Sequence, residues 1–200
     1  TVGTNPKVTD GGYKNLFRII ASDTQIGANM AIYAANVMKV KNVGVIDDRT
    51  AFGQGVADEF TKEAKKLGLN IVGQEFTTDK STDFLAILTN LKAKNPEAIF
   101  FGGYAPQAAP MARQMKQLGL KAKLLGGDTL CSPEVGKLGG DAVNDTVFCA
   151  QGGTMLDKID AGAAFKAKYK ERFKRDPDAY AASYYDQTML IGNAMAKAES

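Results

Sequence analysis

The sequence predicts an α/β fold built on a doubly wound parallel sheet. Short apolar runs of strand length alternate along the chain with amphipathic runs of helix length, and turn residues separate them. This alternation is typical of parallel strands that are joined by crossover helices. Gly68 and Gly119 stand where two of the helical runs end, which is the usual place of a C-terminal capping glycine.

Between residues 21 and 149 the expected elements form one self-contained sheet domain. The expected strands span 43–46, 71–76, 98–101, 123–125 and 146–148. The expected helices span about 23–37, 53–67, 84–91 and 106–118. Asp23 is the expected N-cap of the first helix, and Ser81 or Thr82 that of the third. Pro106 begins the fourth helix.

The two ends of the chain do not complete a second sheet. Residues 150–200 contain helical runs at 163–173 and 182–197 with no strand between them. Residues 1–20 contain a turn-rich loop and one short expected strand, 16–20, that has no partner of its own. We therefore expect both ends to belong to a second domain whose sheet lies outside this chain, with crossovers near Ile20 and Cys149.

Composition argues against several classes of function. The formal net charge is only +3, and the basic residues are scattered, so nucleic-acid binding is not expected. No stretch approaches the roughly 18 apolar residues of a membrane span. No leader begins the chain, so any targeting segment is expected to have been removed. Histidine is absent, which removes the commonest general base and metal ligand. We expect no enzyme activity, no cofactor and no metal.

One glycine pair invites a different interpretation. Gly53 and Gly55 are spaced like the start of a dinucleotide-binding fingerprint, but the third glycine of that fingerprint is missing. The sequence favours a tight strand-to-helix turn at this point instead.

Three groups of residues follow expected strands and are expected to meet at one rim. They occupy positions 47–48, 102–104 and 126–128. Open α/β sheets bind ligands at the carboxyl ends of their strands. Tyr104 offers a ring and a hydroxyl, and Asp128 can pair with a cation. Tyr104 is equally compatible with the edge of a core, Asp128 with a turn cap, and Asp48 with a solvated cap.

Five motifs occur in order along the chain: Thr4-Asn5-Pro6-Lys7-Val8-Thr9, Phe17-Arg18, Val45-Ile46-Asp47-Asp48, Phe52-Gly53-Gln54-Gly55 and Phe100-Phe101-Gly102-Gly103-Tyr104. In order and spacing they resemble the periplasmic binding proteins for branched-chain and related amino acids that serve ABC transporters. The resemblance covers nearly all of the chain and implies the type I periplasmic binding protein fold. It places residues 1–20 and 150–200 in the first lobe and residues 21–149 in the second.

The resemblance also implies a function and a set of site residues. A protein of this kind captures a small amino acid between two lobes in the periplasm and delivers it to a membrane permease, usually as a monomer. The positions that match the family's ligand-binding residues are Val2, Gly3, Thr4, Phe52, Tyr104, Asp128 and Tyr180. Asp128 stands where the family usually has a glutamate that pairs with the ligand's ammonium. Phe52 stands where branched-chain binders often have a tyrosine, so the ligand's identity stays open.

Cys131 and Cys149 follow neighbouring expected strands and are eighteen residues apart. A disulfide is favoured because an exported protein permits one, and it would add roughly 3 kcal/mol of stability. Two buried thiols, or a reactive or metal-binding pair, are the alternatives.

Two other functions stay open at this point. A receptor or transcription regulator can carry a ligand-sensing domain of the same fold. An enzyme or receiver domain could use Asp47 and Asp48 as an acidic pocket for Mg²⁺, although the expected flanking helices fit that alternative poorly.

Overall fold

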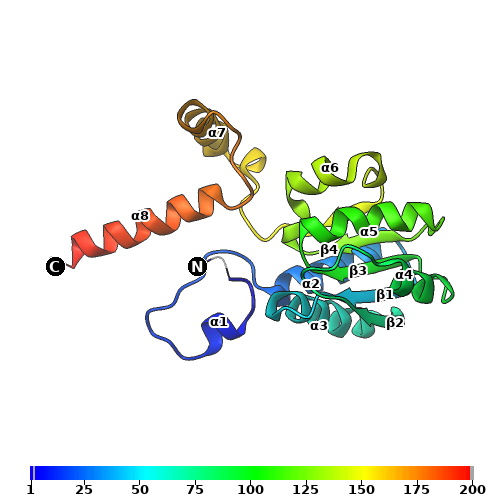
Figure 1. Ribbon diagram of the computed structural model, residues 1–200. Coiled ribbons are helices and arrows are strands. Elements are labelled where there is room, and N and C mark those ends of the chain that lie inside the picture. The colour runs from blue at the N-terminus through cyan, green and yellow to red at the C-terminus, as the bar shows by residue number, and fades with distance from the viewer. Residues whose placement is uncertain (2, 199–200) are drawn as a thin grey trace.

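The computed structural model describes residues 1 and 3–198 of the chain and contains one five-stranded parallel sheet. The order of its strands is β2-β1-β3-β4-β5, and every neighbouring pair is parallel (Figure 1). The strands are β1 Asn42–Asp47, β2 Asn70–Phe76, β3 Ala98–Gly102, β4 Lys123–Gly126 and β5 Val147–Cys149. The expected α/β class with a doubly wound parallel sheet is therefore confirmed.

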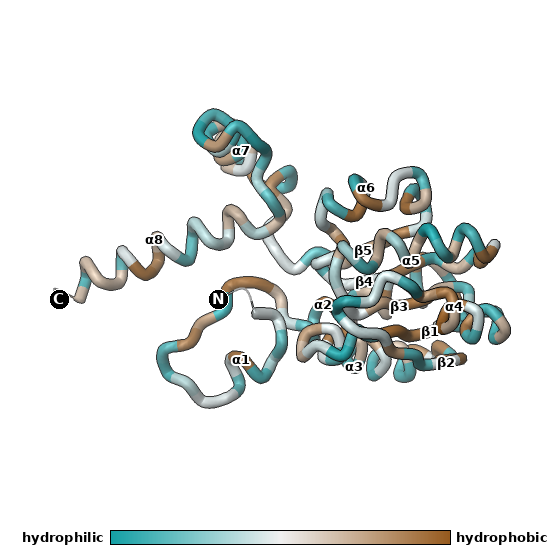
Figure 2. The backbone as a smooth tube through the Cα atoms, viewed as in Figure 1, coloured by the Kyte–Doolittle hydropathy of each residue, from teal (hydrophilic) through white to brown (hydrophobic). Residues whose placement is uncertain are grey.

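Helices cover both faces of the sheet and enclose two apolar clusters. Helices α2 (Asp23–Ile32) and α3 (Ala51–Lys66) pack on one face, where the Phe60 and Phe100 rings stack with centroids 4.1 Å apart. Helices α4 (Leu85–Lys92) and α5 (Ala105–Gln117) pack on the other face around Phe101. The central strands β1 and β3 are accordingly among the most apolar stretches of the backbone trace (Figure 2). A sheet buried on both faces needs such near-continuous apolar strands.

The register of the sheet brings the ends of its strands to one edge. Asp47 pairs with Gly102, Phe101 pairs with Gly126, and Gly126 pairs in turn with Cys149. The chain order reverses between β1 and β3, which makes their carboxyl ends the topological switch point of the sheet. The loops after β1, β3 and β4 therefore share one rim.

The N-cap of helix α2 lies one residue earlier than the sequence predicts. Ser22 is its N-cap, and the Ser22 backbone N–H donates to Gln25 Oε1 at 3.0 Å. Asp23 is the first helical residue and is fully buried, so the expectation that it caps the helix is wrong. The helical run continues from Tyr33 to Val37 as a π-helix.

The expected cap of α4 is also wrong. Phe84 is its N-cap, and the Asp83 carboxylate accepts from the Leu85 backbone N–H at 3.0 Å. Ser81 instead accepts from the Thr78 backbone N–H at 3.3 Å in the turn after β2. A hydroxyl bonded within its own turn is not free to cap the helix that follows.

Glycines serve two different purposes around α3 and α5. Gly68 and Gly119 have φ angles of 78° and 64° and end these helices as predicted. Gly53, by contrast, lies inside α3, and a Cβ there would lie 2.5 Å from the Gly102 carbonyl oxygen. The expectation of a glycine turn is wrong, because the turn is made at Arg49, whose φ is 61°. Gly53 instead lets α3 approach the end of β3.

The terminal segments lie beside the sheet domain rather than in it. The expected strand 16–20 is absent, since no strand of the described residues runs beside it. The N-terminal segment contains the short helix α1 (Lys7–Asp10), and the C-terminal segment contains α7 (Asp160–Phe173) and α8 (Ala181–Lys197). Both segments extend away from the sheet (Figure 1). Among the residues described, no helix is both long and apolar enough to cross a membrane.

The remaining elements are short. They are α6 (Pro133–Gly139) and the 3₁₀ turns η2 (Asp128–Cys131), η3 (Gly140–Ala142) and η4 (Leu156–Lys158).

Candidate ligand-binding site

A small pocket of about 280 Å³ opens where the sheet rim meets the two terminal segments. It is lined by Gly3, Thr4, Asn5, Val8, Phe52, Tyr104, Asp128, Thr129 and Tyr180. Every site residue named from the sequence is in this set except Val2, which lies outside the described residues. Five separate segments contribute, so the fold gathers residues that are up to 177 positions apart in the chain, from 3 to 180.

Two aromatic rings form one wall of the pocket. Phe52 lies in the first turn of α3 and Tyr104 is the N-cap of α5, and their ring centroids are 5.2 Å apart at 47°. Gln107 fixes this corner: its side chain accepts from the Tyr104 backbone N–H at 3.3 Å and donates to the Thr78 carbonyl at 2.6 Å. A tilted aromatic pair of this kind offers an apolar surface to a ligand side chain.

Asp128 supplies a buried acid group at the end of β4. Its side chain is only 5% exposed, and Oδ1 has no hydrogen-bond partner among the described residues. Burial, followed by the charge of Asp23, raises the pKa of Asp128 to about 6 although bonds from backbone N–H groups act the other way. A buried acceptor without a partner is costly, and it marks a place where a donor or cation would be stabilised.

Tyr180 brings a second unpartnered polar atom to the same pocket from the start of α8. Its hydroxyl is buried and has no hydrogen-bond partner among the described residues. The ring lies against the crossover after β5, where a Cβ on Gly152 would come within 3.5 Å of the Tyr180 hydroxyl. Glycine at 152 therefore leaves room for the tyrosine beside the sheet domain.

The N-terminal loop lines another part of the pocket and is held by Arg18. Thr4 is 5% exposed, and its carbonyl accepts from the Asp23 backbone N–H at 2.8 Å. Arg18 Nη1 donates to the Asn5 carbonyl at 3.2 Å and to the Gly3 and Thr4 carbonyls at 3.5 Å. The Gly3 backbone N–H donates to the Thr1 hydroxyl at 3.1 Å. The loop thus carries a positive charge directly behind it.

Asp23 lies behind the pocket as a second buried acid. Neither of its carboxylate oxygens has a hydrogen-bond partner among the described residues. Burial raises the pKa of Asp23, while nearby Thr4 and Arg18 act in the opposite direction. Burial and, after it, the charges of Asp48, Asp128 and Asp23 raise the pKa of Tyr104.

Sequence reasoning overlooked several of these groups. Asn5, Val8 and Thr129 line the pocket, and Arg18 and Asp23 stand behind it. The sequence around Asp23 predicts a helix cap, because aspartate before an apolar periodic run is the usual capping signal. The Phe17-Arg18 motif contained the only sequence signal for the loop anchor.

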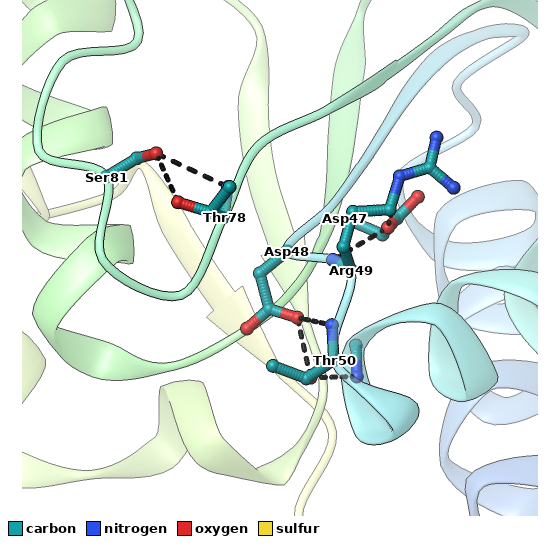
Figure 3. Close-up of polar contacts among 7 residues, drawn as sticks. Asp47, Asp48, Arg49, Thr50, Thr78 and Ser81 are labelled. Atoms are coloured by element: carbon teal, nitrogen blue, oxygen red, sulfur yellow. Dashed lines mark hydrogen bonds and ion pairs between the residues drawn. The ribbon is translucent and has the colours of Figure 1, made fainter.

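Asp47 and Asp48 do not form an acidic pocket (Figure 3). Asp47 accepts from the Arg49 backbone N–H at 2.9 Å and lies 3.7 Å from its guanidinium Nε. Asp48 is buried rather than solvated, and its Oδ1 accepts from the Thr50 hydroxyl at 2.6 Å. Thr50 in turn caps α3 by accepting from the Gly53 backbone N–H at 2.9 Å. These carboxylates shape the turn that positions Phe52.

The residues described contain no group of three or more His, Cys, Asp and Glu placed to hold a metal ion. A larger hollow of about 730 Å³ lies between α7 and α8, lined by Phe165, Tyr169, Phe173, Tyr185 and neighbours. It lacks a buried acid and lies away from the strand ends, so we place the candidate site at the smaller pocket.

Cys131 and Cys149 are joined by a disulfide, with their Cα atoms 5.4 Å apart. Cys131 ends the 3₁₀ turn that begins at Asp128, and Cys149 is the last residue of β5. The bond therefore lies next to the pocket rather than in a remote part of the domain.

Comparison with known proteins places this chain in a defined family. The family model described as "Periplasmic binding protein" matches residues 1–200. The chain belongs to the periplasmic binding protein family, whose members are substrate-binding proteins. This confirms the resemblance seen in the sequence motifs.

Individual members of the family are similar to this chain over most of its length. The chain is 36% identical to Leu/Ile/Val-binding protein homolog 3 of Brucella melitensis over 90% of this chain and 49% of the relative. It is 32% identical to a leucine-, isoleucine-, valine-, threonine- and alanine-binding protein of Pseudomonas aeruginosa over 70% of this chain and 37% of the relative. A solved leucine-binding protein of Thermotoga maritima superimposes with a TM-score of 0.86 at 28% identity, over 98% of this chain and 56% of that one. The chain thus spans about half the length of such relatives or less.

Proposed function

We propose that this protein captures a small amino acid, branched-chain or related, between two lobes in the periplasm and delivers it to the membrane permease of an ABC transporter. In this proposal the protein is a monomeric carrier without enzyme activity. Residues 21–149 form one lobe, and residues 1–20 and 150–200 contribute to the other. The observation that carries the proposal is the gathering of Gly3, Thr4, Phe52, Tyr104, Asp128 and Tyr180 around one pocket.

The chemistry of the pocket matches the two charges of an amino acid. Asp128 provides a buried anion for the α-ammonium, and the unpartnered Tyr180 hydroxyl can accept a second of its N–H bonds. The loop that contains Gly3 and Thr4 faces the α-carboxylate, with the Arg18 charge behind it. Phe52 and Tyr104 then sort the ligand's side chain by shape.

Closure in this proposal is a hinge motion at the two crossovers. The Ala21 backbone N–H donates to the Gly152 carbonyl at 2.9 Å, so the two crossover segments lie side by side. A ligand that contacts both lobes stabilises the closed arrangement by the contacts that the open arrangement lacks. The permease would then select the closed, loaded form.

A binding screen followed by two matched variants tests the proposal. Thermal-shift measurements against the standard amino acids find the ligand, because binding to the native state alone raises its melting temperature. Calorimetry should then show that Asp128→Asn weakens binding by about 100-fold or more, since the partner ammonium loses its buried counter-charge. Asp79→Asn, at an exposed loop position, should leave the dissociation constant unchanged.

Analogues of the ligand make the test independent of folding. The des-amino analogue of whichever amino acid binds should not compete for the site, because it lacks the cation that Asp128 recognises. Equal binding of the des-amino analogue, or an unchanged dissociation constant in Asp128→Asn, would refute the role of Asp128.

A further inference from the structure

The disulfide joins the segment that carries Asp128, which lines the candidate pocket, to the end of the strand that leads toward Tyr180. On one side, Cys131 follows Asp128 by three residues and closes the short 3₁₀ turn η2. On the other side, Cys149 ends β5 and leads directly into the crossover that passes Tyr180. A covalent bond therefore lies between the segment with the buried acid and the segment next to the buried phenol.

The turn that carries Asp128 is otherwise held by noncovalent contacts. The Asp128 side chain has no hydrogen-bond partner for Oδ1, and the Thr129 hydroxyl makes one bond, to the Gly103 carbonyl at 2.6 Å. Leu130 packs over Gly126, where a Cβ would come within 2.3 Å of the leucine side chain. Within this four-residue turn, the backbone N–H groups of Asp128 and Thr129 also bond to the Asp128 carboxylate. The disulfide adds a covalent restraint between the turn and the end of β5.

The other end of the bond is anchored to the crossover. Cys149 pairs with Gly126 at the edge of the sheet, and the Ala150 backbone N–H donates to the Gly126 carbonyl at 3.1 Å. Three residues after Cys149, the Gly152 carbonyl accepts from the Ala21 backbone N–H on the other crossover, and Gly152 lies against the Tyr180 hydroxyl. A displacement of the Asp128 turn is therefore resisted through Cys149 by both crossover segments.

We propose that the Cys131–Cys149 disulfide is a positioning element that holds the Asp128 carboxylate toward Tyr180, so the oxidised protein binds ammonium ligands more tightly than the reduced protein. This inference rests on the proposed function. Reduction by dithiothreitol transfers two electrons and two protons to the bond, giving two cysteine thiols and the cyclic disulfide of the reagent. Both cysteines are half-buried, within reach of a small reductant.

Calorimetry on the oxidised and the reduced intact protein tests the inference directly. The dissociation constant of the amino acid found in the screen should rise about 10-fold on reduction, within the usual range of coupling between sites. The reductant should have no effect on the Cys131→Ser, Cys149→Ser double variant, whose affinity should equal that of the reduced protein. Circular dichroism at the titration temperature establishes that each form is folded.

Linkage supplies a readout that a purely structural disulfide does not change. If oxidation tightens ligand binding by some factor, saturating ligand must lower the equilibrium constant for reduction of the bond by the same factor. The equilibrium constant for reduction, measured in defined dithiothreitol buffers, should therefore be about 10-fold lower with saturating ligand than without it. An equilibrium constant for reduction that saturating ligand leaves unchanged would overturn the inference.

The outcomes separate the two proposals. If the oxidised protein binds no amino acid, both the proposed function and this inference fail. If oxidised and reduced proteins bind equally while both are folded, the disulfide stabilises the fold only and this inference alone is overturned. Should the reduced protein unfold, Cys131→Val with Cys149→Ala fills the space without the covalent bond. Affinity equal to that of the oxidised protein in this pair would also overturn the inference.

Discussion

The sheet domain and the terminal segments differ in where their apolar side chains go. In the sheet domain, Phe60, Phe84, Phe100 and Phe101 are at most 1% exposed. In the terminal segments, large apolar side chains of similar size stand on the surface. They include Tyr13, Phe17, Phe173, Tyr184, Tyr185, Met189, Leu190, Ile191 and Met195. The same kind of side chain is a core residue in one region and a surface residue in the other.

This difference shows what a parallel sheet contributes to burial. Helices α2 to α5 each pack against the sheet. The two apolar clusters therefore lie between the sheet on one side and helices on the other. Helix α8 has no strand beside it in the described residues, and only Ala182 and Ser183 at its start are buried. Exposed apolar side chains gathered on one helix typically mark a surface that another element covers. We propose the rest of the first lobe as that element.

The largest effect on stability is expected in the centre of the sheet domain. Phe60→Ala removes a fully buried ring that stacks on Phe100, so it should lower the free energy of unfolding by about 3–5 kcal/mol. Tyr185→Ala in α8 is the matched change at an exposed ring and should have far less effect. Urea denaturation followed by circular dichroism measures both. Equal losses would contradict the division into a packed domain and loosely packed ends.

A smaller and pH-dependent effect is expected where the two regions meet, at Asp128. Its pKa is about 6 in the folded protein and 3.8 in an unfolded chain, so the folded state binds more protons between these values. Its contribution to stability is therefore greatest at low pH and is lost as the pH rises through 6, by about 3 kcal/mol in all. The pKa values of Asp23 and Tyr104, on the same rim, are also raised. The measurement must therefore separate the titration of Asp128 from theirs.

Comparison with Asp128→Asn isolates it. Without ligand, the variant should gain stability over the natural protein at pH 7 and little at pH 4, as measured by urea denaturation at both values. The ligand affinity of the natural protein should fall as the pH is lowered from 7 to 5, because protonation of Asp128 below pH 6 removes the anion that pairs with the ammonium. Affinity that is constant from pH 7 to pH 5 would contradict the pairing.

The sequence predicted the sheet domain well because the partners of its elements lie within the same stretch of chain. Apolar runs such as 98–101 could be identified as strands because helices before and after them supply both faces. The run 16–20 has a similar composition, but no strand of the described residues pairs with it, and it adopts no strand. The composition of an apolar run does not show whether a neighbouring strand is available to pair with it.

The candidate site was predictable in its members but not in its electrostatics. The positions of Asp128 and Tyr104 follow from the strand ends, whereas Tyr180 and the N-terminal loop came only from the family resemblance. The burial of Asp23 depends on how Thr4 and Gly55 pack around α2, where a Cβ on Gly55 would lie 3.0 Å from Asp23 Oδ2. Such contacts join distant segments, so a local pattern indicates a cap and misses a buried charge.

The smallest effect is expected on the exposed face of α8, and it also tests the proposed second lobe. Ile191 is 63% exposed, so Ile191→Gln in this 200-residue chain should change the free energy of unfolding by no more than about 0.5 kcal/mol. Ile99→Gln, at a fully buried position in β3, is the control that should be strongly destabilising. In a longer chain that supplies the rest of the first lobe, Ile191→Gln should become costly, by about 2 kcal/mol or more, because the side chain is then buried. An equally small cost in both chains would mean that this face of α8 stays exposed, and the assignment of residues 150–200 to a second lobe would be wrong.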